Sequence, residues 1–248
     1  MIRWIWAFID RPTAQFEDAL AFWTAATATH LSPRRGDNDE FVTLLPAHGD
    51  PCIKAQAVGT GGGVHIDLDV EDVREALTRA EKLGATVIAD HDTYVIMSSP
   101  QGQVFCLTGE DGGELPAPAV APDGTLSKLD QICIDVGPSG FQDEARFWAE
   151  LTGWQPRPHP TLTEFIHLIP DRMMPVRILL QRVGEERPTS AHLDLACSDI
   201  SALADWHETL GARKVRRGGH WIVMTDPTGY TYCLTGRDPK AVHGKASA

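Results

Sequence analysis

The sequence lacks the features that define several large classes of protein. No apolar run approaches the length of a membrane span, and the first residues show neither the charged leader nor the long apolar core of a signal peptide. Basic residues are scarce, since 22 Lys and Arg stand against 34 Asp and Glu and give a net charge of −12. A basic face is needed to bind nucleic acid phosphates. These absences predict a cytoplasmic protein whose partner is neither a membrane nor a nucleic acid.

The sequence also contains few cysteines, and it lacks the motifs typical of a serine nucleophile or of a nucleotide-binding loop. The five cysteines are an odd number and include no Cys-x-x-Cys, which predicts reduced thiols rather than a disulfide framework. No Gly-x-Ser-x-Gly motif appears. The glycine run at 59–63 lacks the Rossmann spacing and does not lead from a strand into a helix, so it predicts no nucleotide loop. The basic cluster at 213–217 is interpreted as a solvated turn.

What the sequence does contain is a long internal repeat. Residues 98–109 and 225–236 are identical at six of twelve positions, and both read as a Pro-x-Gly turn followed by a strand with a cysteine on one face. Further blocks match in the same order at offsets of 124 to 127 residues. This period is far too long for a solenoid. The repeat therefore predicts a duplicated domain: residues 1–112 and 127–237, joined by a Pro/Gly/Ala-rich linker at 113–126 and followed by a frayed tail at 238–248.

Each half predicts the same order of elements. A strand is followed by a helix and two strands, and then by another strand, a second helix and two or three strands. In the second half a Pro-rich loop is expected at 155–160. The expected architecture is α+β, with two βαβββ modules per domain forming a curved mixed sheet whose helices lie outside. The cupped inner face of such a sheet is where a ligand is expected.

The sequence resembles a known family at these motifs. The segment Phe147-Trp148-Ala149-Glu150-Leu151-Thr152-Gly153-Trp154, the two His-x-Asp-Leu strands, the Leu-Gly-Ala steps and the Asp-Pro-Thr-Gly turn are similar to the vicinal oxygen chelate superfamily, in particular its glyoxalase-like domains. The superfamily includes glyoxalase I, bleomycin-resistance proteins and extradiol dioxygenases. The resemblance covers both halves and implies a tandem pair of such domains. It implies no single function, because this fold carries several.

The resemblance implies a candidate metal site in the second half. The family's metal enzymes place ligands on the first strand, on the strand before the second helix and on the closing strand, and these positions fall on Gln131, His192 and Cys233. In the first half, the first position falls near Trp6, which cannot bind a metal. The family's hard carboxylate is replaced by a soft thiol, which could join a zinc site. A cysteine on an apolar strand is more often a small buried hydrophobe. The residues therefore favour a site without metal over one with zinc, nickel, manganese or iron.

The repeated histidines are candidate catalytic residues. His65 and His192 each either hydrogen-bond a loop carbonyl or point into the cup toward a ligand. Asp67 and Asp194 lie two residues further on the same strand face, and each could orient its histidine or cap a helix. A histidine–carboxylate pair in a pocket could act as a general base.

Tryptophans and glutamines supply candidate ligand-binding side chains. Trp4, Trp6 and Trp221 lie on predicted strands and could line a cup, although core packing is the more common use of tryptophan. Gln181 could add a fourth group to the candidate metal site, and Gln56 is its counterpart in the first half.

Three functions remain open at this point. The first is a small-molecule-binding protein, acting by sequestration as resistance proteins do or by metal-independent chemistry. The second is a metal-dependent lyase or dioxygenase. The third is a structural or partner-binding module whose cups are filled by aromatic side chains. The expected partner is a small organic molecule, and four modules in one chain allow either a monomer or a homodimer.

Overall fold

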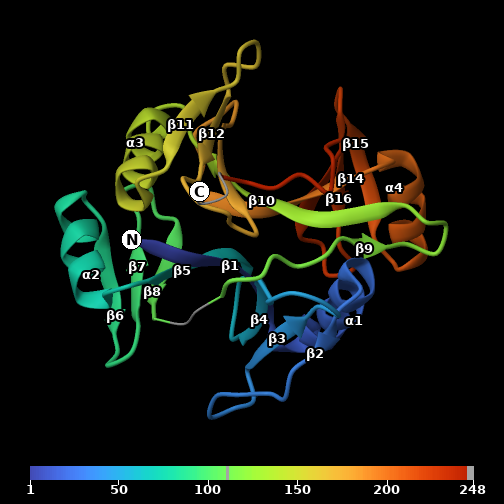
Figure 1. Ribbon diagram of the computed structural model, residues 1–248, viewed down its shortest axis with the longest axis horizontal. Coiled ribbons are helices and arrows are strands. Elements are labelled where there is room, and N and C mark those ends of the chain that lie inside the picture. The colour runs from blue at the N-terminus through green and yellow to red at the C-terminus, as the bar shows by residue number, and fades with distance from the viewer. Residues whose placement is uncertain (110–111, 245–248) are drawn as a thin grey trace.

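The computed structural model describes residues 1–109 and 112–244, and it consists of two halves built around separate sheets (Figure 1). The first half contains the following elements in chain order: β1 (Ile2–Pro12), a 3-10 turn (Thr13–Gln15), α1 (Phe16–Thr27), β2 (His30–Leu31), β3 (Phe41–Leu45), β4 (Ile53–Val58), β5 (Gly63–Val70), α2 (Val73–Lys82), β6 (Thr86–Asp90), β7 (Val95–Ser98) and β8 (Val104–Thr108).

The second half repeats this order after a short strand in the linker. Its elements are β9 (Ala119–Val120), β10 (Leu126–Val136), α3 (Phe141–Thr152), β11 (Gln155–Pro158), β12 (Phe165–Ile169), β13 (Arg177–Arg182), β14 (Ser190–Cys197), α4 (Ile200–Thr209), β15 (Arg213–Arg217), β16 (Trp221–Thr225) and β17 (Thr231–Thr235).

The two sheets have the same topology. The first runs β2-β3-β4-β1-β5-β8-β7-β6 and the second runs β11-β12-β13-β10-β14-β17-β16-β15, with β9 beside β10. In each sheet the first strand of one module lies antiparallel to the first strand of the other, as β1 does to β5 and β10 does to β14. The expected α+β fold of tandem domains with mixed sheets is confirmed.

The repeated turns and helix starts follow from local chemistry. Gly102 and Gly229 adopt φ values of +94° and +90° at the two Pro-x-Gly turns, a conformation that favours glycine. Asp72 and Asp199 begin α2 and α4, and each carboxylate accepts hydrogen bonds from two backbone N–H groups of the first helical turn. The same local signals therefore build the same module in both halves.

The first helix of each half packs against the other half (Figure 1). On α1, the rings of Phe22 and Trp23 lie 5.6 and 5.3 Å from the ring of Tyr232 on β17. On α3, Trp148 lies 5.2 Å from the ring of Phe105 on β8. Because these aromatic contacts join segments far apart in sequence, the two halves share one continuous set of packed side chains.

A buried carboxylate lies at each of these two contacts. Asp226, in the turn before β17, accepts hydrogen bonds from the indole of Trp23 at 3.2 Å and from the guanidinium of Arg11 at 2.6 Å. At the other contact, the carboxylate is on the helix, where Glu144 accepts from Trp148 at 2.7 Å and from Ser99 at 2.5 Å. The acid thus comes from the turn in one contact and from the helix in the other.

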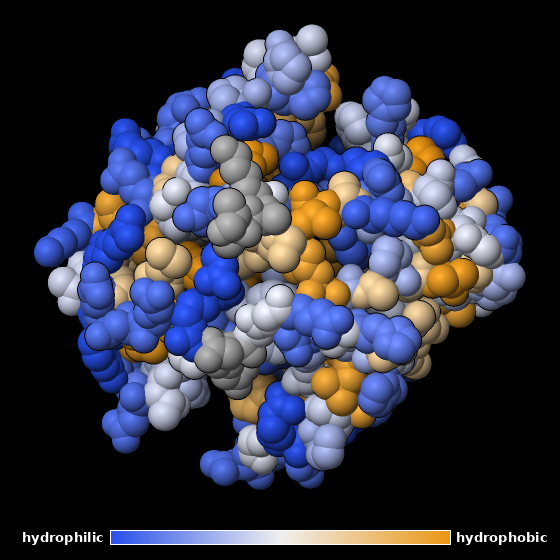
Figure 2. Space-filling view, in the orientation of Figure 1, coloured by the Kyte–Doolittle hydropathy of each residue, from blue (hydrophilic) through white to orange (hydrophobic). Residues whose placement is uncertain are grey.

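The burial of the cysteines and the hydrophilic periphery of the molecule are typical of folded domains. All five cysteines are free and buried. Figure 2 shows hydrophilic side chains over most of the periphery, with hydrophobic residues gathered in patches nearer the middle of this face. None of the described helices has the length and apolar character that a membrane span requires.

Three expectations about local structure are wrong. The Pro-rich stretch expected as a loop at 155–160 forms β11, which pairs with β12. The basic cluster expected as a turn forms the exposed edge strand β15, where charged side chains discourage pairing with another chain. The tail is not frayed up to residue 244, because His243 is buried and bridges to Met174. Residues 245–248 of that expected tail lie outside the described residues.

Candidate active site in the second half

A cavity of about 1220 Å³ opens on the inner face of the second sheet. Its lining includes Gln131 on β10, His192 on β14 and Cys233 on β17, three strands that lie side by side. The rings of Phe165 and Trp221, 6.3 Å apart and edge to face, form an apolar part of the wall. The cavity has the size of a site for a small organic ligand.

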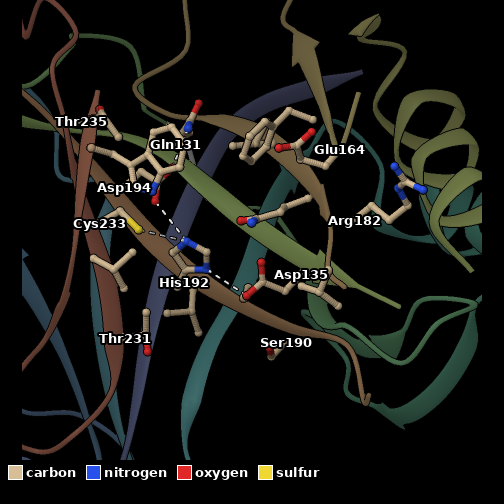
Figure 3. A pocket seen from close by; sticks show the side chains of 18 of the residues that line it. Gln131, Asp135, Glu164, Arg182, Ser190, His192, Asp194, Thr231, Cys233 and Thr235 are labelled. Atoms are coloured by element: carbon tan, nitrogen blue, oxygen red, sulfur yellow. Dashed lines mark hydrogen bonds and ion pairs between the residues drawn. The ribbon is translucent and has the colours of Figure 1, made fainter. Parts of the chain in front are cut away.

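Charged side chains of both signs also line this cavity. Arg11 enters from the first half, and Arg182, Arg187 and Arg237 come from the second. Figure 3 shows Arg182 and Glu164 on the side of the cavity away from Cys233. Arg11, Arg187 and Arg237 are each paired with a carboxylate (Asp226, Asp135 and Asp130). Of these four side chains, Arg182 therefore offers the least neutralised charge to an acidic ligand group beside the apolar surface.

Strand register brings the candidate residues together at one end of the lining. Asp194 pairs with Gln131 on one side and with Cys233 on the other. Since alternate residues of a strand face the same side, His192 shares the face of Asp194, and Asp135 shares that of Gln131. The site is thus a consequence of pairing β10, β14 and β17 in this register.

The imidazole of His192 lies between two carboxylates and a thiol (Figure 3). Its Nδ1 is 3.3 Å from Oδ2 of Asp135. Its Nε2 is 3.2 Å from Oδ1 of Asp194 and 3.6 Å from Sγ of Cys233. All four side chains are almost completely buried. We refer to Asp135, His192, Asp194 and Cys233 as the histidine centre.

The surroundings of His192 favour a charged imidazole when no metal is bound. Burial alone would lower the pKa of His192, but negative charge on its neighbours and the hydrogen bonds to the carboxylates of Asp135 and Asp194 raise it well above the usual value. Burial also raises the pKa of the Cys133 and Cys233 thiols, so they are uncharged at neutral pH. The carboxylates are therefore the groups that hold the proton on the ring. Such an imidazolium can donate a proton to a bound ligand.

Several buried polar atoms of this site have no hydrogen-bond partner. The Nε2 group of Gln131 donates to Oδ2 of Asp194 at 2.6 Å, which leaves Oε1 of Gln131 without a partner, while Oδ1 of Asp194 faces the imidazole of His192 at 3.2 Å. Oδ1 of Asp135 is also unpaired. A buried oxygen without a partner costs free energy, so such a group in a cavity is suited to receive a ligand or a cation.

The sequence-based site missed Asp135 and its counterpart Asp10. Asp135 accepts a hydrogen bond from Arg187 at 2.8 Å in addition to its contact with His192. In the first half, Oδ2 of Asp10 lies 2.6 Å from Nδ1 of His65. The internal repeat could have revealed both aspartates, because they are separated by the same offset of 125 residues that relates other residues of the first modules.

The first half contains the same set of groups around its own histidine. His65 lies between Asp10 and Asp67, with Nε2 3.4 Å from Oδ1 of Asp67, and Cys106 belongs to the same cluster. Burial would lower the pKa of His65, but the charge and hydrogen bond of Asp10, followed by Asp67 and Cys106, raise it well above the usual value. The repeat therefore copied the histidine and its acids.

Three larger or charged side chains fill the corresponding space in the first half. Trp6 and Phe8 occupy the strand positions that Gln131 and Cys133 hold in the second half. The ammonium of Lys54 is buried among them, 4.2 Å from the ring centroid of Trp6 and 3.9 Å from Oδ2 of Asp67. The first cup is thus occupied by its own side chains at the place where the second holds the histidine centre.

The expected ligand-binding residues have different locations. Trp221 and Gln181 line the large cavity, and Sγ of Cys133 lies 3.5 Å from Oε1 of Gln181. Trp4 is buried in the core and donates to a backbone carbonyl, while Trp6 lies beside Lys54 in the filled cup. These two tryptophans and Gln56 are not among the residues that line the large cavity.

The donors of the histidine centre fit a zinc ion better than the harder metals. His192, Asp194 and Cys233 each offer an atom, and these atoms lie within 4.8 Å of one another. Bond lengths of about 2.0 Å to nitrogen or oxygen and about 2.3 Å to sulfur place the ligand atoms of tetrahedral zinc about 3.3 to 3.6 Å apart. The separations from Nε2 of His192 are 3.2 Å to Asp194 and 3.6 Å to Cys233.

Both halves of the chain match the same family model. A model described as a glyoxalase-like domain matches residues 6–108 and residues 131–235, so the matches cover both sheets and the histidine of each half. No curated protein matches the chain at a significant level.

Solved structures with this fold include several enzymes. The Mn(II)-bound glyoxalase from Novosphingobium aromaticivorans is 15% identical, with a TM-score of 0.67 over 98% of this chain and 83% of that one. The 2,2',3-trihydroxybiphenyl 1,2-dioxygenase from Sphingomonas wittichii strain RW1 is 14% identical, with a TM-score of 0.62 over 95% and 90% of the two chains. The 2,3-dioxygenase LapB from Pseudomonas sp. KL28 is 14% identical, with a TM-score of 0.61 over 93% and 90%. At these identities the similarity shows the fold alone.

Proposed function

The chain belongs to the glyoxalase-like domain family in both halves, and we propose that it binds a small organic molecule in the second half alone. The observation that carries this proposal is the cavity of about 1220 Å³ above the histidine centre. The corresponding space of the first half is filled by Trp6, Phe8 and Lys54. We call the second half the working half, because it holds the ligand-binding cavity; the first half packs against it.

The lining supports a ligand that is apolar or aromatic in its body and acidic at one end. Phe165 and Trp221 offer ring faces and edges to an apolar body. Arg182 and Arg187 offer guanidinium groups to a carboxylate or another acidic group. His192 is the group that would transfer a proton to or from the ligand in a metal-independent reaction, with Asp135 and Asp194 holding the ring.

A metal-dependent lyase or dioxygenase is the second candidate. It is favoured by one observation, the clustering of His192, Asp194 and Cys233 with unpaired oxygens at the floor of the cavity. The third function, a module whose cups are filled by aromatic side chains, describes the first half better than the second, because Trp6 and Phe8 fill only the first cup.

The proposal is tested with the dye 8-anilinonaphthalene-1-sulfonate (ANS), which has an aromatic body and an acidic group and fluoresces in apolar sites. We expect saturable binding of a single dye molecule per chain. Replacing Leu179 with Trp should abolish this binding, because Leu179 lines the cavity. The matched first-half variant, Lys54→Met, should bind as the wild type does.

Thermal unfolding of each variant separates loss of binding from loss of the fold. Absence of saturable binding by the folded wild type, or equal loss in the Leu179→Trp and Lys54→Met variants, would contradict the proposal.

A further inference from the structure

We propose that the large cavity contains a second anion-binding site, and that its ligand is an aromatic molecule with a carboxylate at each end. One carboxylate binds near Arg182 and the other near Arg237, and both arginines line the cavity. This inference rests on the proposed function and deepens it by naming the class of ligand. We refer to Asp130, Arg177, Arg237 and His243, together with His167, as the basic end of the cavity.

One buried carboxylate at the basic end is shared by several nitrogen-bearing side chains. Oδ2 of Asp130 lies 2.9 Å from Nε of Arg237 and 3.5 Å from a terminal nitrogen of Arg177. Oδ1 of Asp130 lies 2.7 Å from Nε2 of His243. Two guanidinium groups therefore face a single carboxylate, which leaves at least one positive charge in excess. An excess charge in a largely buried site favours a bound ion of the opposite sign.

Several nitrogen atoms of the basic end have no hydrogen-bond partner. Asp130 faces Nε of Arg237, and no described residue accepts a hydrogen bond from the two terminal nitrogens of that side chain. Nε of Arg177 and Nδ1 of His167 are buried and also lack partners. Buried polar atoms are normally hydrogen-bonded, so these atoms are suited to a ligand. A guanidinium with free terminal nitrogens can donate two parallel hydrogen bonds to a carboxylate.

The pKa of His167 agrees with an excess of positive charge. His167 lies on β12 and lines the cavity. Its pKa is lowered to about 4, first by burial and then by the neighbouring Arg237 and His159, with His243 acting in the same direction and Asp130 in the opposite one. At neutral pH the ring is therefore uncharged and can donate a hydrogen bond from one of its nitrogens.

Strand register places His167 and His192 on the same face of the second sheet. His167 pairs with Leu179, Leu179 pairs with Cys133, and Cys133 pairs with His192. Residues that pair across neighbouring strands point to the same face. Three strand spacings of about 4.8 Å separate the backbones of the two histidines by roughly 14 Å. Leu179 lines the cavity between them and gives the ring body of the ligand an apolar floor.

The two anion sites lie toward opposite ends of β10. Arg182 pairs with Val136, the last residue of β10, whereas Asp130 lies six residues earlier on the same strand. A strand rises about 3.3 Å per residue, so roughly 20 Å of backbone separates the two positions. Long arginine side chains take up part of this distance. The remaining space suits a pair of aromatic rings, which Phe165 and Trp221 contact from the wall.

A β-bulge and the segment after β17 together build the basic end. The register of β10 against β14 shifts around Asp130, and a bulge of this kind can redirect a side chain beside a functional site. The chain after β17 turns back, so that Arg237 and His243 both reach Asp130. Lys128 fixes the same segment by donating to the carbonyl of Ala241 at 2.7 Å.

The first half has different residues at the positions of the basic end. At the offsets of 124 and 125 that relate the two halves, Asp130, Arg177 and His167 correspond to Ile5, Cys52 and Thr43. Ile5 and Cys52 are buried members of the hydrophobic core. The hydroxyl of Thr43 accepts a hydrogen bond from Arg35 at 2.9 Å. The basic end therefore belongs to the second half, which also holds the cavity.

The test compares ligands that share a ring body and differ by one carboxylate. The pairs are 2-naphthoate with naphthalene-2,6-dicarboxylate and biphenyl-4-carboxylate with biphenyl-4,4'-dicarboxylate, so that two ligand lengths are covered. Isothermal titration calorimetry on the full-length chain measures each affinity. In at least one pair, the dicarboxylate should bind about tenfold more tightly than the monocarboxylate, which corresponds to about 1.4 kcal/mol.

Variants locate the second carboxylate at the basic end. Arg237→Gln should remove the preference for the dicarboxylate, because one end of the ligand loses its cation, while the monocarboxylate still binds through Arg182. His167→Leu should reduce the preference without changing the net charge at neutral pH. The matched control is Arg213→Gln, which removes an exposed arginine of β15 that does not line the cavity and should keep the preference. Circular dichroism confirms that each variant is folded.

Several outcomes would overturn the second anion site: equal affinities within both pairs, a preference that survives in both folded Arg237→Gln and folded His167→Leu, or an equal loss of preference in Arg213→Gln. These failures are distinct from failure of the proposed function, because the monocarboxylates and ANS still report binding in the cavity. Absence of binding by ANS and by all four carboxylates would instead contradict the proposed function, and this site with it.

Discussion

The two halves of this chain carry the same histidine between the same two acids, yet the large cavity of the described residues is lined by His192 and not by His65. His65 and His192 have matching partners in Asp10 and Asp135 and in Asp67 and Asp194. The difference lies in the surrounding side chains, because the first half has Trp6, Phe8 and Lys54 where the second has Gln131, Cys133 and Leu179. A duplicated domain can thus keep its reactive side chains while larger neighbouring side chains fill the space in which a ligand would bind.

The contacts between the halves differ in a similar way. Asp226 and Glu144 each accept a hydrogen bond from a tryptophan of the first helix, but they come from opposite sides of their contacts. Only Asp226 has a cationic partner, Arg11, which crosses from the other half. The two contacts should therefore respond differently to mutation and to pH.

The largest expected effect on stability comes from the Arg11→Met substitution. Both Arg11 and Asp226 are buried, and their nitrogen and oxygen atoms are 2.6 Å apart. Removing one member of a buried pair leaves the other charge uncompensated and costs about 3–5 kcal/mol in the free energy of unfolding. Denaturant unfolding measures this cost.

The matched control is Arg74→Met, which removes an exposed pair with Asp90. Its cost should be at most about 1 kcal/mol. Similar costs for the two variants would show that the Arg11 pair does not hold the halves together.

The second expected effect is the dependence of stability on pH at the α1 contact. His207, fully buried beside Phe22 and Tyr232, has its pKa lowered to about 4 by burial. The unfolded chain, with a histidine pKa near 6.5, binds the proton more strongly, so stability should fall as pH decreases from about 6.5 to about 4, by about 3 kcal/mol in total. Unfolding at several pH values should show that His207→Gln loses this part of the acid sensitivity.

The α3 contact should show the opposite sign. Burial raises the pKa of Glu144, outweighing the hydrogen bonds from Ser99, Trp148 and the Gln101 backbone. Because the folded pKa lies above the unfolded value, stability from this group is lost as pH rises through the folded pKa. In Glu144→Gln, the free energy of unfolding should therefore change less with pH above about pH 4.5 than it does in the wild type. A variant that instead lost stability only at acidic pH would contradict the raised pKa of Glu144.

A smaller effect is expected on ligand binding. Trp221→Ala removes part of the cavity wall and should weaken the binding of ANS about tenfold, which corresponds to about 1.4 kcal/mol. Tyr94 holds the matching position in the first half, where it stacks on His91. Tyr94→Ala should leave the affinity unchanged, and a loss as large as that of Trp221→Ala would place the dye in the first half.

The smallest effect should be equal in the two halves. Asp72→Ala and Asp199→Ala each remove an N-cap carboxylate that accepts two backbone hydrogen bonds. Each should cost about 1 kcal/mol in thermal or denaturant unfolding. Clearly unequal losses in the free energy of unfolding would show that the two halves differ in the stability of these helices as well as in the residues that line their sheets.

The sequence predicted what local chemistry and the repeat determine. The turns at Gly102 and Gly229 and the strands that follow them were correct because their residues have few alternatives. The same holds for the placement of His192 and Cys233 on neighbouring strands, which followed from the family resemblance.

The rest depends on contacts between distant segments. Asp135 was missed because its role depends on how β10 pairs with β14, and a sequence does not state a register. The packing of Trp23 against Asp226 joins residues 203 positions apart, which no local pattern reveals. The edge strand β15 was mistaken for a turn because most of its side chains are basic.

The most direct test of the account is to locate a bound ligand in both halves at once. A crystal of the full-length chain soaked with a brominated aromatic carboxylic acid, measured at the bromine absorption edge, gives an anomalous difference map that shows each bound molecule. The expected result is one strong peak in the cavity lined by His192 and none beside His65. Peaks of equal height in both halves, or a peak beside His65 alone, would contradict the assignment of the second half as the working half.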